Sequence, residues 1–334
     1  MIGQLYGVNG KKFQRQYKNH LSGFKTWGQK PHAEDWLVFP ENISEELSLD
    51  EVALSDGELY TVLTSKKAKG RKGSIVAVVK GTRSEDVVAH FRKIPQKLRK
   101  QVKEITLDMS GSMKLIARTC FYNAAQTVDR FHVQKLALEA LQEIRIKHRW
   151  KAIDKENEII AEAKKKGEKP EFEVFENGDS LKQLLARGRY LLYKSRENWT
   201  QSQKERAKIL FGKYPDLQKA YQLTDELRKI YNQKIIKSVA LLKLAHWFKD
   251  VEEFGNKAFS TVVRTITTHY NDILNYFTNR STNASAESFN AKIKNFRIQL
   301  RGVKDRSFFR ISIKTWGEKI KLIILWNAKR VRTS

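Results

Sequence analysis

The stretch "ELSLDEVALSDGELYTVLTSKKAKGRKGSIVAVVKG", residues 46–81, contains three segments in which β-branched and other apolar residues alternate with polar ones. This alternation is typical of a strand with one buried face. A turn at Asp56 and Gly57 separates the first two segments, and a loop of Lys, Arg and Gly separates the second from the third. The stretch therefore predicts a three-stranded meander.

The chain continues with an α/β pattern up to His132. An amphipathic segment that ends at Pro95 predicts a helix, and "VKEITLDMS", "GSMKLIARTCF" and "AAQTVDRFH" predict a strand, a helix and a strand. Crossover helices imply that the last two strands join the sheet in parallel. After His132, long helical periods predict an all-helical region.

A helical period returns in "TNASAESFNAKIKNFRIQLRG", residues 282–302. One apolar stripe is expected to face a core, and it consists of Phe289, Ile293, Phe296 and Leu300. The opposite face is expected to carry Glu287, Asn290, Lys294, Arg297 and Arg301. This face is either solvated, with Glu287 favoured near the helix N-terminus by the dipole, or meets a polyanion while Glu287 holds a cation.

The composition favours a folded protein with a polyanionic partner. The chain has 334 residues, 64 Lys and Arg against 37 Asp and Glu, a formal charge of +27 and 40% hydrophobic residues. Its single cysteine, Cys120, excludes a disulfide framework and suits a reducing cytoplasm. Because no run reaches the roughly 18 apolar residues of a membrane span, we expect a soluble, cytoplasmic protein without membrane contact.

These patterns divide the chain into four segments. Residues 1–46 form a short basic N-terminal arm, and residues 47–132 form the first part of an α/β core. Residues 133–280 form a helical insertion, and residues 281–334 supply the core's return helix and basic C-terminal helices.

Two acids lie at strand positions where they can meet. Asp50 belongs to the first strand and Asp108 ends the fourth, and in a parallel crossover topology these strands can be neighbours. Each has a simpler explanation, since Asp108 could cap the following helix and Asp50 could be an exposed strand acid. Charges inside apolar strands are nevertheless expensive without a partner, so the pair is a candidate site.

At these residues the chain resembles the DDE transposases of bacterial insertion sequences, in particular the ISL-three type. The resemblance covers roughly residues 47–320 and rests on five blocks: "SLDEVALSDGELYTVLTS", "ITLDMSGSMK", "TVDRFHVQKL", "RYLLYKSRENWT" and "TNASAESFNAKIK". It implies a ribonuclease-H-like mixed sheet with the order β-β-β-α-β-α-β-α, interrupted by a large all-helical insertion.

The resemblance also implies metal-dependent DNA strand cleavage and strand transfer. Its acidic triad would be Asp50, Asp108 and Glu287, with Asp50 bridging two Mg²⁺ ions, or Mn²⁺ as a substitute, and the other two acids each holding one ion. The implied partners are the ends of the transposon and its target DNA, with homo-oligomers forming on DNA in the nucleoid. The alternative is a catalytically inactive or domesticated DNA-binding protein.

Other residues receive supporting or binding roles. By resemblance, Asp129 and His132 support the second acid or nearby backbone, as opposed to a plain strand-end acid and a capping histidine. Asn290 is also assigned a supporting role. The expected DNA contacts are Lys69, Arg71, Lys72, Lys294, Arg297 and Arg301, although a merely solvated loop at residues 66–73 is equally compatible with the sequence.

Two further expectations concern the helical insertion and the N-terminal arm. Trp199 and Trp247 are expected in the packed core, the alternative being an aromatic that stacks on an unpaired base. Because the arm is short and without cysteine, recognition of the DNA ends is expected either from a separate protein or not at all, the chain then being a truncated remnant.

The basic charge predicts DNA binding that tolerates sequence and is sensitive to salt. The affinity of the chain for DNA should fall steeply with salt, because each neutralised phosphate contributes about 0.9 to the slope of log affinity against log salt concentration. A filter-binding or anisotropy titration measures this slope. An affinity that stays constant between low and moderate salt would contradict the prediction.

Overall fold

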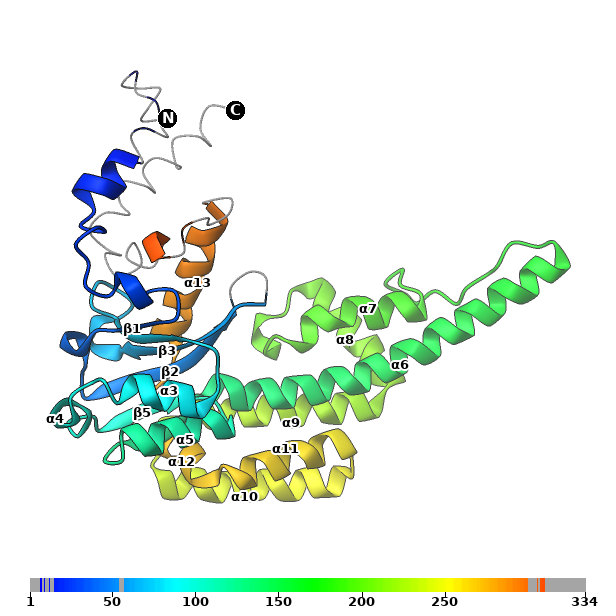
Figure 1. The fold of residues 1–334 in the computed structure, drawn as a ribbon. Coiled ribbons are helices and arrows are strands. Elements are labelled where there is room, and N and C mark those ends of the chain that lie inside the picture. Colours follow the sequence, from blue (N-terminus) through cyan, green and yellow to red (C-terminus); the bar gives the residue numbers. More distant parts are fainter. Residues whose placement is uncertain are drawn as a thin grey trace. The chain divides into compact units, whose positions relative to one another are not determined.

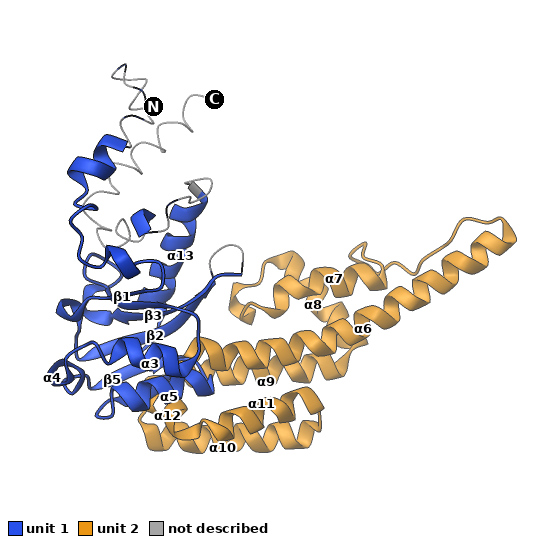
Figure 2. Ribbon diagram, viewed as in Figure 1, with its two compact units in different colours: residues 1–129, 281–334 blue, residues 130–280 orange. Residues whose placement is uncertain are grey.

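The computed structural model describes residues 7, 9, 12, 15–53, 57–299, 305 and 307–309. It divides into two compact units, residues 1–129 with 281–334 and residues 130–280 (Figure 2). The first is an α/β unit and the second is built from helices. The helical unit starts slightly before the expected residue 133, because the helix after the last strand begins at Arg130.

The α/β unit contains a mixed sheet of six strands in the order β1-β4-β3-β2-β5-β6 (Figure 1). The strands are β1 Trp36–Val38, β2 Glu46–Ala53, β3 Leu59–Ser65, β4 Ile75–Lys80, β5 Glu104–Leu107 and β6 Ala125–Val128. Strands β2, β3 and β4 pair antiparallel, whereas β5 pairs parallel with both β2 and β6. The predicted meander and the parallel crossovers are therefore confirmed.

The N-terminal arm contributes more to this unit than its sequence indicated. Strand β1 pairs antiparallel with β4 at the edge of the sheet, with Trp36 opposite Val79 and Val38 opposite Ala77. A strand of three residues is too short to display a period of two, so the sequence carried no signal for it.

One face of the sheet is apolar and packs against three helices, α3 Ser84–Phe91, α4 Gln96–Arg99 and α5 Gly111–Cys120. Alternating residues of the strands point into this core, for example Leu47 and Leu49 of β2 and Ile105 and Leu107 of β5. Cys120 is buried there as expected, and burial raises the pKa of its thiol to about 11.

The other face is partly covered by α13, Ala284–Gln299, the helix predicted in residues 282–302. The expected apolar stripe is buried, with Phe289, Ile293 and Phe296 packed against Leu37, Phe39 and Ile75. Leu300 lies outside the described residues. A helix distant in sequence thus returns to the sheet because its apolar stripe completes a second core.

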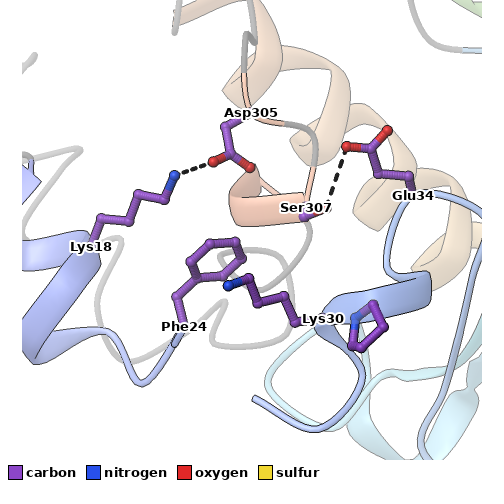
Figure 3. Close-up of a pocket in the computed structure, with 7 residues that line it drawn as sticks. Lys18, Phe24, Lys30, Glu34, Asp305 and Ser307 are labelled. Atoms are coloured by element: carbon purple, nitrogen blue, oxygen red, sulfur yellow. Dashed lines mark hydrogen bonds and ion pairs between the residues drawn. The ribbon is translucent and has the colours of Figure 1, made fainter. Parts of the chain in front are cut away.

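The N-terminal segment contacts the residues that follow α13. The ammonium group of Lys18 pairs with Asp305, and the hydroxyl of Ser307 donates to Glu34 at 3.4 Å (Figure 3). These residues line a surface pocket together with Phe24, Lys30 and Pro31. None of the predicted catalytic acids lines this pocket.

The helical unit has seven α-helices among its described residues. They are α6 Arg130–Lys166, α7 Leu181–Leu192, α8 Gln201–Lys213, α9 Pro215–Asn232, α10 Lys237–Phe254, α11 Lys257–Thr268 and α12 Tyr270–Asn279. The only strand-like pairing described in this unit is an isolated bridge between Val174 and Ser180. Across the described part of the chain, no helix is both long and apolar enough to cross a membrane.

Both tryptophans singled out in the insertion belong to its core. Trp199 and Trp247 are buried, and their indole N–H groups donate to the carbonyls of Leu191 and Leu223, each at 2.8 Å. Neither ring is presented for stacking on a base, so the core-packing interpretation is confirmed.

A buried carboxylate joins two helices of the helical unit. The side chain of Asp179 has 0% exposure, and it pairs with Arg187 of α7 and with Arg206 of α8, the latter at 2.7 Å. Burial alone would raise the pKa of Asp179, but hydrogen bonds from Arg206 and Arg187 outweigh it and hold the pKa below its ordinary value. The ion pairs therefore stabilise the packing of α7 on α8 while Asp179 is ionised.

We predict that Asp179→Asn lowers the free energy of unfolding by about 3 kcal/mol, because it leaves Arg206 without its counter-charge. In the unaltered chain, this contribution is present above the unfolded-state pKa near 3.9 and is lost as pH falls from there toward the folded-state pKa. Urea denaturation at several pH values measures both effects. Asp154→Asn, at an exposed acid of α6, should change stability by less than about 0.5 kcal/mol.

Candidate acidic site on the sheet

The parallel pairing of β2 with β5 places two predicted acids beside each other. Ser48 lies opposite Thr106 in the register, Asp50 lies two residues further along β2, and Asp108 directly follows the last residue of β5. Side chains two positions apart in a strand share a face, so both carboxylates lie on the face that also carries Ser48 and Thr106. Both acids are half-buried.

Local hydrogen bonds orient each carboxylate. Oδ1 of Asp50 accepts from the backbone N–H of Glu51, and Oδ1 of Asp108 accepts from that of Ser110, each at 2.8 Å. Helix α5 begins at Gly111 without a side-chain cap. Asp108 therefore bonds the N-cap residue of α5 without capping its first turn, and Asp50 is half-buried, while the metal-binding role of both acids stays a prediction.

A further acid, Glu51, belongs to the same cluster and was missed by the sequence reasoning. Burial raises the pKa of Glu51, and repulsion from Asp108 and Asp50 raises it further. The cluster thus concentrates negative charge at one end of β2 and β5. The only sequence signal was that Glu51 directly follows Asp50 in the strand.

Helix α13 contacts this cluster through an amide. Nδ2 of Asn290 donates to Oδ2 of Asp50 at 2.7 Å, and Asn290 is only 7% exposed. Oδ1 of Asn290 is buried, and no described residue hydrogen-bonds to it. Glu287 lies one turn earlier on α13 and is exposed.

Among the described residues, no three His, Cys, Asp or Glu side chains are gathered closely enough to hold a metal ion.

The expected polar face of α13 requires a correction. Asn290 contacts Asp50, and Arg297 pairs with Glu58 at 3.1 Å with both side chains largely buried. These two residues therefore extend the sheet-facing side of the helix, whereas Glu287 and Lys294 remain exposed. The buried side of α13 predicted from the sequence was too narrow, because only apolar residues were counted as buried. Arg301 lies outside the described residues, and the DNA contacts of Lys294 and Arg297 stay predictions.

The segment that leads into α13 is attached to the polar face of the sheet. Oδ2 of Asp129, which is 2% exposed, accepts from the backbone N–H of Asn283 at 3.0 Å. The ammonium group of Lys66 donates to the hydroxyls of Thr106 and Ser281. Burial lowers the pKa of Lys66, and Glu104, Glu46 and Asp129 oppose this by raising it.

These contacts bear on residues expected to support the site. Asp129 binds backbone just before α13, and its supporting role in catalysis stays a prediction. His132 belongs to the helical unit, where it is half-buried in the first turn of α6 with Phe131 edge-on to its ring. Lys66 was not singled out by the sequence, since it reads as one of several lysines in a loop.

The basic loop lies against the first turns of α13. Gly70 has φ +70°, and a Cβ at this position would lie 3.3 Å from the carbonyl oxygen of Ser285, so only glycine is accommodated without strain. The loop thereby presents three exposed cations beside the helix, Lys69, Arg71 and Lys72. Lys292 of α13 is close as well, because its Nζ lies 3.9 Å from the same Cβ position.

Comparisons with known proteins agree on one family. The family model described as "Transposase", of the ISL3 DDE type, matches residues 47–313. A curated relative, the "Transposase for insertion sequence element IS1001" of Bordetella parapertussis, is 23% identical over 273 residues, which is 81% of this chain and 60% of the relative. The chain thus spans about 60% of the length of that relative. No solved structure matches. With its family model matched over most of its length, the chain belongs to the ISL3-type DDE transposases.

Proposed function

We propose that this chain cleaves DNA strands at the ends of an insertion sequence and transfers them to a target, using Asp50, Asp108 and Glu287. The observation that carries the proposal is the parallel register of β2 and β5, because Asp50 lies on β2 two residues beyond Ser48 and Asp108 follows directly after its neighbour β5. The hydrogen bond from Asn290 to Asp50 adds to it, because it fixes the helix that carries Glu287 against the same strand. Family membership supports the same reaction class.

The sheet supports a ribonuclease-H-like core. Omitting the edge strand β1, its order is β4-β3-β2-β5-β6, with an antiparallel meander followed by two parallel strands. The first acid then belongs to the central strand β2 and the second follows its parallel neighbour β5. In open sheets, the carboxyl ends of parallel strands are a common position for ligand sites.

The chemical type of the oxygen donors at the site suits a divalent cation such as Mg²⁺. Asp50 and Asp108 supply hard carboxylate oxygens, and the buried Oδ1 of Asn290 is a further oxygen without a hydrogen-bond partner among the described residues. Burial and, after it, repulsion from Asp108 and Asp50 raise the pKa of Glu51, and a bound cation would offset the repulsive part. Asp50, Asp108 and Glu287 would hold the ions, and bound Mg²⁺ would activate the attacking oxygen and stabilise the leaving one.

The surrounding residues are suited to bind and orient a DNA strand. Carboxylates repel phosphate, so the exposed cations of the basic loop and Lys294 would supply the attraction that draws the backbone over α13. Asn290 orients Asp50, while Asp129 and Lys66 fix the chain just before α13. We also propose self-association on DNA and a separate protein for recognition of the ends.

We predict that Asp50→Asn, Asp108→Asn and Glu287→Gln each abolish Mg²⁺-dependent DNA cleavage while DNA binding stays equal or becomes tighter. The physical reason is that each change removes a metal ligand and also a charge that repels phosphate. A nicking and strand-transfer assay on DNA with the element's ends measures the first effect, and anisotropy measures the second.

Asp86→Asn is the matched control, because Asp86 is an exposed acid of α3 in the same unit. It should leave cleavage close to that of the unaltered chain. Near-normal cleavage by any one triad variant would remove that residue from the site, and retention by all three would refute the enzyme. DNA binding by the unaltered chain without any cleavage would favour the inactive DNA-binding alternative.

We also predict that Lys66→Met reduces cleavage by about 10- to 100-fold, the range typical when a residue that orients metal ligands is lost. The loss of its bonds to Thr106 and Ser281 should loosen the start of α13, and with it Glu287. Hydrogen exchange of the amides of residues 281–290 should rise, and the Mg²⁺ concentration for half-maximal cleavage should increase.

Lys66→Arg, which keeps the charge and can still donate to both hydroxyls, should restore part of the activity. Unchanged exchange at residues 281–290 together with an unchanged Mg²⁺ requirement would show that Lys66 does not position α13.

A further inference from the structure

One side-chain amide at the acidic site has a satisfied nitrogen and an unsatisfied oxygen. Nδ2 of Asn290 donates to Oδ2 of Asp50 at 2.7 Å. Oδ1 of the same amide is buried, and within the described part of the chain it accepts no hydrogen bond. The side chain of Asn290 is 7% exposed, so bulk water has little access to it. A buried acceptor without a donor costs folding free energy, which points to a ligand for this oxygen.

Acidic side chains accompany this oxygen. Asp50 touches the amide, Glu51 follows Asp50 in β2, and Asp108 comes directly after β5, the parallel neighbour of β2. Ionised carboxylates accept hydrogen bonds and cannot donate them, so these acids do not satisfy Oδ1 of Asn290. A hard cation is the ligand that amide and carboxylate oxygens bind together.

Asn290 adds an oxygen to those of the acids. No three His, Cys, Asp or Glu side chains lie close enough together to hold a metal ion within the part of the chain that the structure describes. Asparagine oxygens are ligands of hard cations, as carboxylate oxygens are. The hydrogen bond to Asp50 keeps the whole amide beside that carboxylate, since Oδ1 and Nδ2 share one carbon atom.

Rotation of the amide exchanges its two outer atoms. The oxygen and the nitrogen are similar in size, and the torsion that turns an asparagine amide has a broad energy well, so half a turn hardly alters the packing. The N–H group suits an Asp50 carboxylate without a cation. A cation at Asp50 would repel this N–H group and attract Oδ1.

We propose that Asn290 is a ligand of the divalent cation at Asp50, and that its amide turns to present Oδ1 when the cation is bound. In the cation-free site, Nδ2 holds Asp50 in place instead. The inference rests on the proposed function and deepens it, because it adds a ligand from α13 to the predicted acids. It also couples the cation to the position of α13, the helix that carries Glu287.

The first test changes the chemical type of the proposed ligand in the full chain. Asn290→Cys puts a thiol at the position of the amide, and thiolates favour Zn²⁺ whereas oxygen ligands favour Mg²⁺. Relative to the unaltered chain, the ratio of Zn²⁺ affinity to Mg²⁺ affinity should rise at least about tenfold. The rise of the melting temperature with the concentration of each metal measures both affinities.

Ser288→Cys is the matched control, because Ser288 is exposed on the same helix, roughly 200° around its axis from Asn290. It introduces the same thiol and should leave the ratio close to that of the unaltered chain. If Asn290 only oriented Asp50, its replacement by Cys would weaken both metals alike, so an unchanged ratio would overturn the proposal. Equal rises in the two cysteine variants would overturn it as well, since zinc would then bind the thiol wherever it lies.

A second test uses the unaltered chain and so remains decisive if Asn290→Cys does not fold. In a chain with isotope-labelled asparagine, NMR follows the side-chain amide of Asn290, which is identified by its absence from the spectrum of Asn290→Asp. Saturating Mg²⁺ should shift this signal and speed the exchange of its N–H hydrogens with water, because the bond to Asp50 is released. Exchange that stays equally slow in saturating Mg²⁺ would contradict the turn of the amide.

The proposed function and this inference fail in different ways. If Mg²⁺ did not raise the melting temperature of the unaltered chain, either alone or with DNA that carries the element's ends, the proposed function itself would be contradicted. Mg²⁺ binding that Asp50→Asn abolishes, together with an unchanged metal ratio in Asn290→Cys, would contradict only the role of Asn290.

Discussion

The return of the chain to the sheet at residues 281–290 is the constraint on which the site depends. The hydrogen bond between Asn290 and Asp50 joins residues 240 positions apart, and the bond between Asn283 and Asp129 joins residues 154 positions apart. Together with the ion pair between Arg297 and Glu58, these contacts add directional restraints to the apolar stripe of α13. Hydrophobic contact is non-directional, whereas a hydrogen bond to a carboxylate oxygen fixes the position of the helix along the strand.

One face of the sheet forms the hydrophobic core, and the other carries the polar residues of the candidate site. On one face, the apolar side chains of β2 and β5 form the core with α3 and α5. On the other, buried polar residues lie on these strands and on β6, including Ser48, Thr106 and Thr127. Burying polar groups is unfavourable unless they are hydrogen-bonded, so this face is stable only with partners such as Lys66 and Asn283. Asp50 lies further along β2 on this face, and Asp108 directly follows β5.

Several acids of the described chain pair with cations, whereas those of the candidate site do not follow this pattern. Acids that hold elements together are matched by cations, as Asp179 is by Arg187 and Arg206, and Glu58 by Arg297. Glu51 is instead half-buried beside the like charges of Asp108 and Asp50, which raise its pKa after burial has done so. Repulsion that folding does not relieve marks surfaces where a ligand of opposite charge lowers the free energy.

The sequence by itself determined the elements and their buried sides. Alternation predicted β2, β3 and β4, helical periodicity predicted α13, and the burial of Cys120, Trp199 and Trp247 followed from their apolar neighbours. These features depend on residues close together in the chain, where the period of side-chain direction is set by backbone geometry. Asp50 and Asp108 could be paired because the strand order follows from crossover topology.

Only the tertiary structure decided which polar side chains meet. Asn290 and Arg297 were expected on the outer face of α13, yet they contact Asp50 and Glu58. Glu51 and Lys66 were not distinguished from other charged residues, and β1 was too short to show a period. The physical reason is that periodicity reports the average burial along one element, whereas a contact between charges depends on how remote elements pack within a few ångströms of each other.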